Sequence, residues 1–311
     1  MTEDLAILYL MRSPGIGPRT LCRLLGHLRA ANVTAVEFLR LPAGDRAEDF
    51  DLKPEIAASI ESSNSEAELL YAALEAHAVR MLVIGADDYP KRLNAVLGDT
   101  APPVLFVRGN LELLEVSAAG FCGSRKASAK GLEIAAETAG LLARRGVNIV
   151  SGYAGGVDLA AHTGALSSGG ATTFVLATGI LHYTQKSAVA GYLSDDNHLV
   201  ISEFSPRLGW SAHNAMQRNH TIVGLTDLMV LVESGMTGGT FEAGKVALRH
   251  QHPLYVVAPG ARGDTAAGNV YFLERGARPL MVEADDPVAV DELITVLDEG
   301  QIETRQTNLF P

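Results

Sequence analysis

The feature that most constrains the fold of this chain is an alternation of short apolar runs with segments of helical periodicity between residues 78 and 283. The runs are VLFVRG, SAAGFCG, VNIVSG, TTFVLATG, HLVISEF, LMVLVES and PLYVVAPG, and the helical segments cover roughly 129–145, 156–168, 184–193, 212–224 and 240–250. Apolar strands separated by amphipathic helices are typical of right-handed βαβ units, in which helices cover both faces of a parallel sheet. The sequence therefore predicts a doubly wound, mostly parallel, Rossmann-like α/β domain.

The first part of the chain has a different texture, because it contains helical segments and no β-branched run. LAILYLMRS and PRTLCRLLGHL read as two helices joined by the turn SPGIGP. This is the pattern of a helix-hairpin-helix or SAM-like domain, in which backbone N–H groups of the turn can face a phosphate; we slightly favour the alternative, an ordinary tight turn between packed helices. We therefore expect a small helical domain at 1–65, a Rossmann-like domain at 66–283, and a short helix with a flexible tail at 284–311.

Composition limits the compartment and the chemistry. Only two cysteines, Cys22 and Cys122, occur in 311 residues, so neither a disulfide framework nor a C-x-x-C metal site is expected. The N-terminus carries acids where a secretory signal carries bases, and no apolar run reaches the length of a membrane span. We expect a cytoplasmic protein with no membrane partner, no metal and no cofactor.

The negative net charge of −11 is unevenly distributed along the chain. Residues 120–250 hold ten Lys and Arg against nine Asp and Glu, whereas the remainder holds fifteen bases and twenty-seven acids. Six of the nine histidines also fall inside the central segment. A local basic surface on an acidic protein is thus compatible with the sequence, as is scattered solubilising charge.

Ligands of doubly wound sheets bind beyond the carboxyl ends of the strands, so the residues that follow each run are the candidate site. The first such turn is Gly123-Ser124-Arg125-Lys126, between a strand and a helix. Small residues there let the backbone approach a phosphate, the helix N-terminus offers free N–H groups, and Arg125 is a bidentate donor. The spacing is not G-x-G-x-x-G, so it does not predict a dinucleotide site.

The second turn contains Gly152, Gly155 and Gly156 and leads into another helix. Asp158 and His162 follow four residues apart, on one face of that helix. They are candidates for an acid–base pair or for two metal ligands. Without a third ligand, we favour the alternative in which Asp158 stabilises the first helical turn and His162 is a hydrogen-bonded neighbour.

The third group of candidates comes from two further turns. Its members are the phosphate-binding candidates Arg218, Asn219, His220, Gly238, Gly239, Thr240 and Lys245. Glu242 lies in the first turn of the last predicted helix, where it either complements the helix dipole or acts as a catalytic group.

Taken together, these blocks resemble the DprA/Smf family of DNA-processing proteins. The resemblance rests on DDYPKRLNAVLGDTAPPVLFVRGN, GSRKASAKGLEIA, VNIVSGYAGGVDLAAHTGAL, SEFSP, RNHTIVGLTDLMVLVES and TGGTFEAGKVALRHQHPLYVVAPG, which occur in the family's order. It implies a homodimer that binds single-stranded DNA without sequence preference and loads a RecA-type recombinase, as in natural transformation. The family's basic pocket would correspond to Arg125, Lys126 and Arg218.

The chain also departs from the family pattern. Gln217-Arg218-Asn219-His220 has two cations fewer than the usual R-R-N-R run, so binding should be weaker or depend on pH through His220. Only about thirty residues follow the predicted domain, so we expect no winged helix there. The turn from Thr237 to Glu242 partly resembles the corresponding turn of lysine-decarboxylase-like phosphoribohydrolases. This motivates an alternative, a nucleotide hydrolase or sensor using Glu242 and Arg218, although our leading expectation is a protein without catalytic activity.

The last residues carry a separate motif. Gln306, Leu309 and Phe310 match the Q-x-x-L-F peptide by which replication and repair proteins dock on the sliding clamp. An exposed tail suits such a peptide, and a chance match at a chain end is the alternative.

Overall fold

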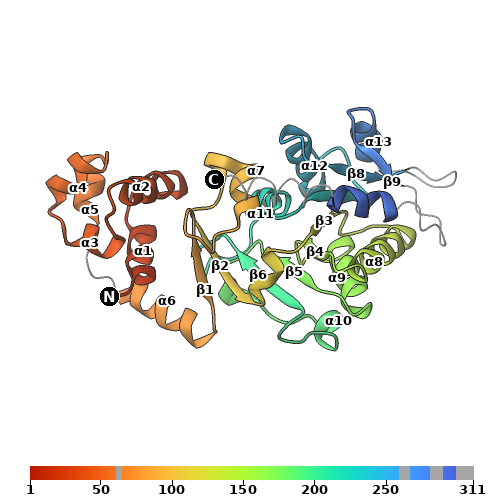
Figure 1. Cartoon of the computed structure of the whole chain (residues 1–311), viewed down its shortest axis with the longest axis horizontal. Coiled ribbons are helices and arrows are strands. Elements are labelled where there is room, and N and C mark those ends of the chain that lie inside the picture. The colour runs from red at the N-terminus through yellow and green to blue at the C-terminus, as the bar shows by residue number, and fades with distance from the viewer. Residues whose placement is uncertain (61–64, 259–266, 281–289, 299–311) are drawn as a thin grey trace. The chain divides into compact units, whose positions relative to one another are not determined.

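The computed structural model describes residues 1–60, 65–258, 267–280 and 290–298 (Figure 1). The chain forms two compact units. Unit 1 comprises Met1–Tyr89 and Gly98–Val107, and unit 2 comprises Pro90–Leu97 and Arg108–Pro311. The predicted domain boundary at residue 65 stays a prediction. In the described part of the chain, no helix is both long and apolar enough to cross a lipid bilayer.

Unit 1 begins with helices and ends with a pair of strands. Its elements are α1 (Glu3–Arg12), α2 (Pro18–Ala30), α3 (Ala35–Arg40), α4 (Ala43–Asp49), α5 (Pro54–Ser59), α6 (Ser65–Ala76), β1 (Arg80–Val83), the 3₁₀ helix η1 (Gly98–Thr100) and β2 (Val104–Gly109). The two strands pair antiparallel, with Met81 opposite Phe106. Apolar residues at helical spacing and local caps determine where these helices form. At α3, for example, Thr34 and Glu37 form a complete capping box.

The SPGIGP turn joins α1 to α2, as predicted. Gly15 has a positive φ of +82°, and a Cβ there would lie 2.9 Å from the side chain of Ile56 on α5. Ile16 N–H donates to the carbonyl of Ser13, and Ser59 Oγ donates to that of Pro14. The turn is thus packed against α5, and its conformation follows from these contacts within unit 1.

Unit 2 is the Rossmann-like domain. Its strands are β3 (Ala118–Cys122), β4 (Asn148–Ser151), β5 (Thr172–Val175), β6 (His198–Ser202), β7 (Leu228–Leu231), β8 (Leu254–Val257) and β9 (Arg278–Leu280). They lie in the order β6-β5-β4-β3-β7-β8-β9, and each neighbouring pair is parallel. The strands of unit 2 form the parallel α/β arrangement that the alternating pattern predicts.

The helices of unit 2 connect these strands. They are α7 (Lys91–Leu97), η2 (Leu111–Leu114), α8 (Ala129–Ala143), α9 (Val157–Ser167), η3 (Ile180–His182), α10 (Ser187–Ala190), α11 (Ala212–Gly224), α12 (Gly239–Arg249) and α13 (Ala267–Leu273). One core cluster contains residues of β3, β4, β7, α8, α9 and the helix at 290–298. In contrast, α11 packs with α7 and α12, as expected for helices on the opposite face of a doubly wound sheet.

The predicted helix at 184–193 is much shorter in the structure. Only Ser187–Ala190 is helical, preceded by the 3₁₀ turn η3. The backbone N–H of Lys186 donates to the hydroxyl of Tyr153 at 2.7 Å, so a contact across the fold replaces the first helical turn. Helical propensity over a few residues is weak enough for such a tertiary contact to override it.

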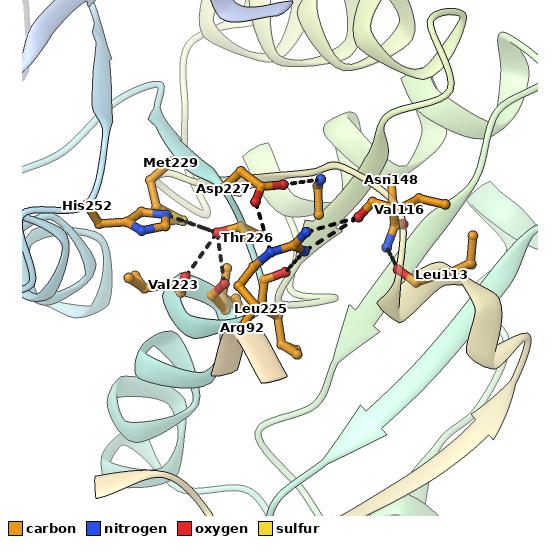
Figure 2. A network of polar contacts seen from close by, with 12 residues as sticks. Arg92, Leu113, Val116, Asn148, Val223, Leu225, Thr226, Asp227, Met229 and His252 are labelled. Carbon is orange, nitrogen blue, oxygen red and sulfur yellow. Dashed lines mark hydrogen bonds and ion pairs between the residues drawn. The ribbon is translucent and has the colours of Figure 1, made fainter. Parts of the chain in front are cut away.

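The amino ends of β3 and β7 are joined by a polar network that contains Arg92 of α7 (Figure 2). Arg92 Nε lies 2.9 Å from a carboxylate oxygen of Asp227, whose other oxygen accepts from Ala118 N–H at 2.8 Å. The guanidinium also donates to the carbonyls of Val116 and Leu225. We call this the amino-edge network (Arg92, Val116, Ala118, Leu225 and Asp227). It fixes α7 to the sheet through one cation with several partners.

Candidate functional site: the carboxyl edge of the sheet

The strand order places several of the predicted turns together. From β3 the chain adds β4, β5 and β6 on one side and then returns to add β7, β8 and β9 on the other. The direction of winding therefore reverses between β3 and β7, and doubly wound sheets bind ligands at such a switch point, beyond the carboxyl ends. We define the strand-end surface as residues 123–126, 152–156, 186 and 210.

The turn after β3 carries two exposed cations, Arg125 and Lys126. Its backbone is held by hydrogen bonds from Ser124 N–H to the carbonyl of Glu233 at 3.0 Å and from Lys126 N–H to Ser124 Oγ at 3.0 Å. Neither Arg125 nor Lys126 has an ion-pair partner within the described ranges. The turn thus presents uncompensated positive charge on a fixed backbone.

The N-terminus of α8 differs from the prediction, because a protein carboxylate already occupies it. Ser128 caps α8 by accepting from Gly131 N–H. Glu233, which follows β7, accepts from the backbone N–H of Ser128 at 3.0 Å and from its hydroxyl. A carboxylate at this position satisfies the helix dipole. Glu233 therefore competes with a phosphate for part of this helix terminus, and phosphate binding by its N–H groups stays a prediction.

The turn after β4 is packed against the first turn. Gly156 has a φ of +75°, and a Cβ there would lie 2.7 Å from the Cα of Arg125. A side chain at this position would therefore push the two turns apart. Val157 N–H also donates to the carbonyl of Ser124 at 3.3 Å. The two glycine turns form one rigid support beneath Arg125.

Arg218 lies beneath this support rather than on the surface. Only 5% of the residue is exposed, and its guanidinium occupies the space that a side chain at position 152 would fill. Arg218 Nη1 donates to the carbonyl of Val175 at 3.0 Å and lies 3.8 Å from a carboxylate oxygen of Asp158. Its buried Nε has no hydrogen-bond partner among the described residues. The predicted phosphate ligand is thus a buried, incompletely partnered cation.

The pairing of Asp158 with Arg218 also decides between the two interpretations of Asp158 and His162. Asp158 accepts from Ala154 N–H as well, whereas His162 is fully buried and its Nδ1 contacts the hydroxyl of Thr172 at 2.6 Å. Burial lowers the pKa of His162 to about 3, helped by the positive charges of Lys186 and Arg218. The described residues contain no metal-ligand cluster. Asp158 and His162 therefore do not form an acid–base pair.

Asn219 of the third group has a partner within the protein. Asn219 Nδ2 donates to the carbonyl of Gly239 at 2.8 Å and links α11 to the N-terminus of α12. Gly238 precedes α12 with a φ of +92°, and no side chain caps this helix. Burial, with Arg249 and His250 nearby, lowers the pKa of His220. The lowered pKa disfavours the protonated, positively charged form of His220.

Glu242 has a partner on its own helix. One of its carboxylate oxygens lies 2.6 Å from Lys245 Nζ, three residues later, and neither side chain is fully exposed. No hydrogen bond or ion pair joins Glu242 to Arg218 in the described part of the chain, and Arg218 is engaged by Asp158. The catalytic role of Glu242 and Arg218 therefore stays a prediction, and the charge of Lys245 is partly neutralised.

Two further residues of this edge are absent from the sequence-based site. Lys186 Nζ donates to the backbone carbonyl of Tyr153 and lies 4.5 Å from the centroid of its ring. Burial lowers the pKa of Lys186, Asp158 raises it, and Arg125 and Arg218 lower it. Lys186 is the only Lys or Arg between residues 145 and 207, and this isolated basic residue could have been identified as a candidate from the sequence. Trp210, whose ring centroid lies 5.3 Å from Arg125 Cζ, gave no periodic signal.

Comparison with known proteins identifies the family. The model of the DNA recombination-mediator protein A family matches residues 80–290. The chain belongs to this family. The family relatives include DNA processing protein DprA of Streptococcus pneumoniae, 30% identical over 205 residues that cover 65% of this chain and 71% of that protein. Protein Smf of Escherichia coli is 30% identical over 200 residues, 64% of this chain and 53% of the other. The match thus spans about half the length of the E. coli relative.

Solved structures of family members share the fold. The crystal structure of S. pneumoniae DNA processing protein A superposes with a TM-score of 0.71 at 25% identity, covering 90% of this chain and 94% of the other. DNA processing protein A from Helicobacter pylori, described for its single-stranded DNA binding mode, gives a TM-score of 0.59 at 22% identity, covering 71% and 96%. The resemblance to the DprA/Smf family and the Rossmann-like fold class are confirmed.

Proposed function

We propose that this chain binds single-stranded DNA through the strand-end surface. The observation that carries the proposal is the pair of exposed, unpaired cations, Arg125 and Lys126, on a turn fixed by Gly156 and by the Glu233 carbonyl. Cations on a fixed backbone are suited to bind the phosphates of a nucleic-acid strand. Each contact between a cation and a phosphate releases counterions and does not depend on the identity of the base. Lys186 is a third basic side chain at the same edge, half-buried and with a pKa that burial lowers.

Arg218 contributes to this surface indirectly. It is too buried to reach a phosphate in this conformation, and Asp158 partly cancels its charge. Its guanidinium nevertheless adds to the potential beneath Arg125, since charges in a partly dry region act over several ångströms. The affinity of the surface is thus set by the balance of Arg125, Lys126 and Lys186 against Asp158.

The salt dependence of binding tests this assignment. We expect Arg125→Ala to weaken binding of an oligo-dT and to reduce the slope of log K against log salt by about 0.7, the value for one phosphate contact on a single strand. Arg144→Ala is the matched control, because Arg144 is exposed and ends α8 at the opposite edge of the sheet. Equal slopes for the wild type and Arg125→Ala, measured by fluorescence anisotropy at several salt concentrations, would remove Arg125 from the site.

We further propose that the bound strand is delivered to a RecA-type recombinase, that the protein acts as a homodimer, and that it does so without catalysis. Membership of a recombination-mediator family supports the first point. Glu242 is paired with Lys245 instead of with a second reactive group, which supports the last. The test is recombinase filament formation on single-stranded DNA covered by a single-strand binding protein, with and without this chain. Light scattering measures the oligomeric state.

Docking on the sliding clamp is a separate proposal. The motif residues Gln306, Leu309 and Phe310 support it through their match to the clamp-binding peptide, and they lie outside the described residues. Leu309→Ala with Phe310→Ala should abolish binding to immobilised clamp while leaving single-stranded DNA binding unchanged. Clamp binding that survives this double substitution would contradict the proposal.

A further inference from the structure

The strand-end surface contains an exposed aromatic side chain that the fold itself does not use. Trp210 is the only tryptophan of the chain and lies between β6 and α11. It is 56% exposed, although tryptophan is on average one of the more buried residues of a folded protein. An exposed indole does not contribute the hydrophobic free energy that its burial would provide. A ligand that covers it therefore gains that free energy on binding.

The exposure of Trp210 does not come from a loosely held segment. The backbone just before it is anchored by two hydrogen bonds of 2.8 Å, from Leu208 N–H to Ser205 and from Gly179 N–H to Leu208. Immediately after it, Ser211 caps α11 by accepting from Asn214 N–H at 3.0 Å. The indole is thus displayed from a backbone fixed on both sides, and binding to it costs little additional ordering.

Trp210 lies beside the cation of the proposed phosphate site. Arg125 Cζ is 5.3 Å from the centroid of the indole, within the range of a cation–π contact. Two further exposed apolar side chains are Leu208 on the same segment, 43% exposed, and Met216 on α11, 37% exposed. A cation for the backbone next to a flat apolar surface for a base is the combination that single-stranded nucleic acid requires.

We propose that Trp210 is a stacking platform for one unpaired nucleobase of the DNA strand whose phosphate contacts Arg125. This inference rests on the proposed function and extends it from the phosphates to the bases. It also supplies a physical reason for preferring single strands, because a base inside a duplex has both faces covered by its neighbours. Stacking on an indole is available to every base, so the contact adds affinity without sequence preference.

Because Trp210 is the only tryptophan of the chain, its intrinsic fluorescence reports directly on binding at this position. We would titrate the protein with an oligo-dT and with an abasic oligonucleotide of the same length and charge, and follow intrinsic fluorescence and anisotropy. Stacking predicts strong quenching with oligo-dT, and about tenfold weaker binding with little quenching for the abasic strand. Equal affinity and equal quenching for the two strands would overturn the proposal, since phosphate contacts alone would then account for binding.

Variants separate the base contact from the phosphate contact. Trp210→Ala should lose about tenfold in affinity for oligo-dT, keep its affinity for the abasic strand and keep the salt slope, whereas Trp210→Phe should retain most of the affinity. The matched control is Tyr192→Ala. Tyr192 is a 48% exposed aromatic whose carbonyl accepts from Asn197, the residue before β6, at the amino edge of the sheet.

The outcomes also distinguish failure of the base contact from failure of the proposed function. If Arg125→Ala weakens both strands and Trp210→Ala weakens neither, the stacking proposal is wrong and the phosphate site stands. If neither variant changes the binding of either strand, the strand-end surface is not the DNA site. If Trp210→Ala leaves DNA binding intact but abolishes binding of the recombinase, Trp210 contacts protein and the stacking proposal is again wrong.

Discussion

The two edges of the unit 2 sheet each hold a buried or half-buried arginine beside an aspartate, and they differ in how completely the arginine is partnered. At the amino edge, Arg92 has Asp227 at 2.9 Å and two backbone carbonyls (Figure 2). At the carboxyl edge, Arg218 has Asp158 at 3.8 Å and one carbonyl, with its Nε unpartnered within the described residues. A partly buried cation with several partners holds the elements around it together, whereas a buried cation with an unpartnered donor leaves positive potential for a ligand.

The largest effect is expected at the amino edge. Asp227→Ala removes the partner of Arg92 and the acceptor of Ala118 N–H, and should lower the free energy of unfolding by about 3 kcal/mol, without changing DNA affinity in the folded protein. Urea denaturation and anisotropy measure the two quantities. The control is Asp88→Ala, which breaks the exposed Arg80–Asp88 pair and should cost at most about 1 kcal/mol. A loss of DNA affinity in folded Asp227→Ala would contradict the assignment of a purely structural role to the amino edge.

The next effect is a pH dependence due to His162. Because burial holds its folded-state pKa at about 3, below the ordinary 6.5, His162 stays neutral in the folded protein while the unfolded chain takes up a proton. Its contribution to stability is therefore complete above pH 6.5 and is lost as the pH falls toward 3. Between pH 7 and pH 5 the loss amounts to about 2 kcal/mol. Urea denaturation of His162→Gln at both pH values should show a pH dependence smaller by that amount.

At the carboxyl edge, Asp158→Asn should lower the stability of the protein but raise its affinity for DNA. Removing the carboxylate leaves Arg218 without its ion-pair partner and lowers the free energy of unfolding by about 2 kcal/mol. It also raises the positive potential under Arg125, so affinity for single-stranded DNA should increase several-fold at low salt. Denaturation and anisotropy on the same samples test both. Weaker DNA binding would show that Asp158 orders the site rather than limiting its charge.

The smallest effect concerns the turn that opens α12. Glu242→Gln breaks the pair with Lys245 and should change stability by about 0.3 kcal/mol, as for other helical pairs three residues apart. Freed Lys245 should raise DNA affinity slightly. Incubation of wild type and variant with nucleoside monophosphates should release no free base from either. Base release by the wild type that disappears in the variant would revive the nucleotide-hydrolase alternative.

The sequence predicted the parts of this fold that depend on neighbours along the chain. Apolar runs and helical periods gave the strands and most of the helices, and glycine turns marked the carboxyl edge, because each is a local pattern. Pairings between distant residues left no such trace. Arg92 meets Asp227, Glu233 fills the N-terminus of α8, and Asp158 meets Arg218 only after the sheet has formed.

The same reason explains why the site was predicted only in part. Arg125 was placed correctly at a strand end, since the residue after a strand is readable from the pattern. Arg218 was expected to contact phosphate, and its burial could not be foreseen because it depends on the space that Gly152 leaves free. Trp210 carries no periodic signal, and only its exposure in the structure together with its distance from Arg125 singles it out.

The position of α7 in the chain has a consequence for dissecting the protein. Pro90–Leu97 belongs to unit 2, whereas the residues on both sides of it belong to unit 1. No single cut of the polypeptide can therefore yield both units intact. A truncation that begins at residue 108 discards Arg92, and so removes the ion-pair partner of Asp227 and the donor to the carbonyls of Val116 and Leu225. A minimal DNA-binding fragment would have to keep α7, either by starting at residue 90 or by co-expression as a separate peptide.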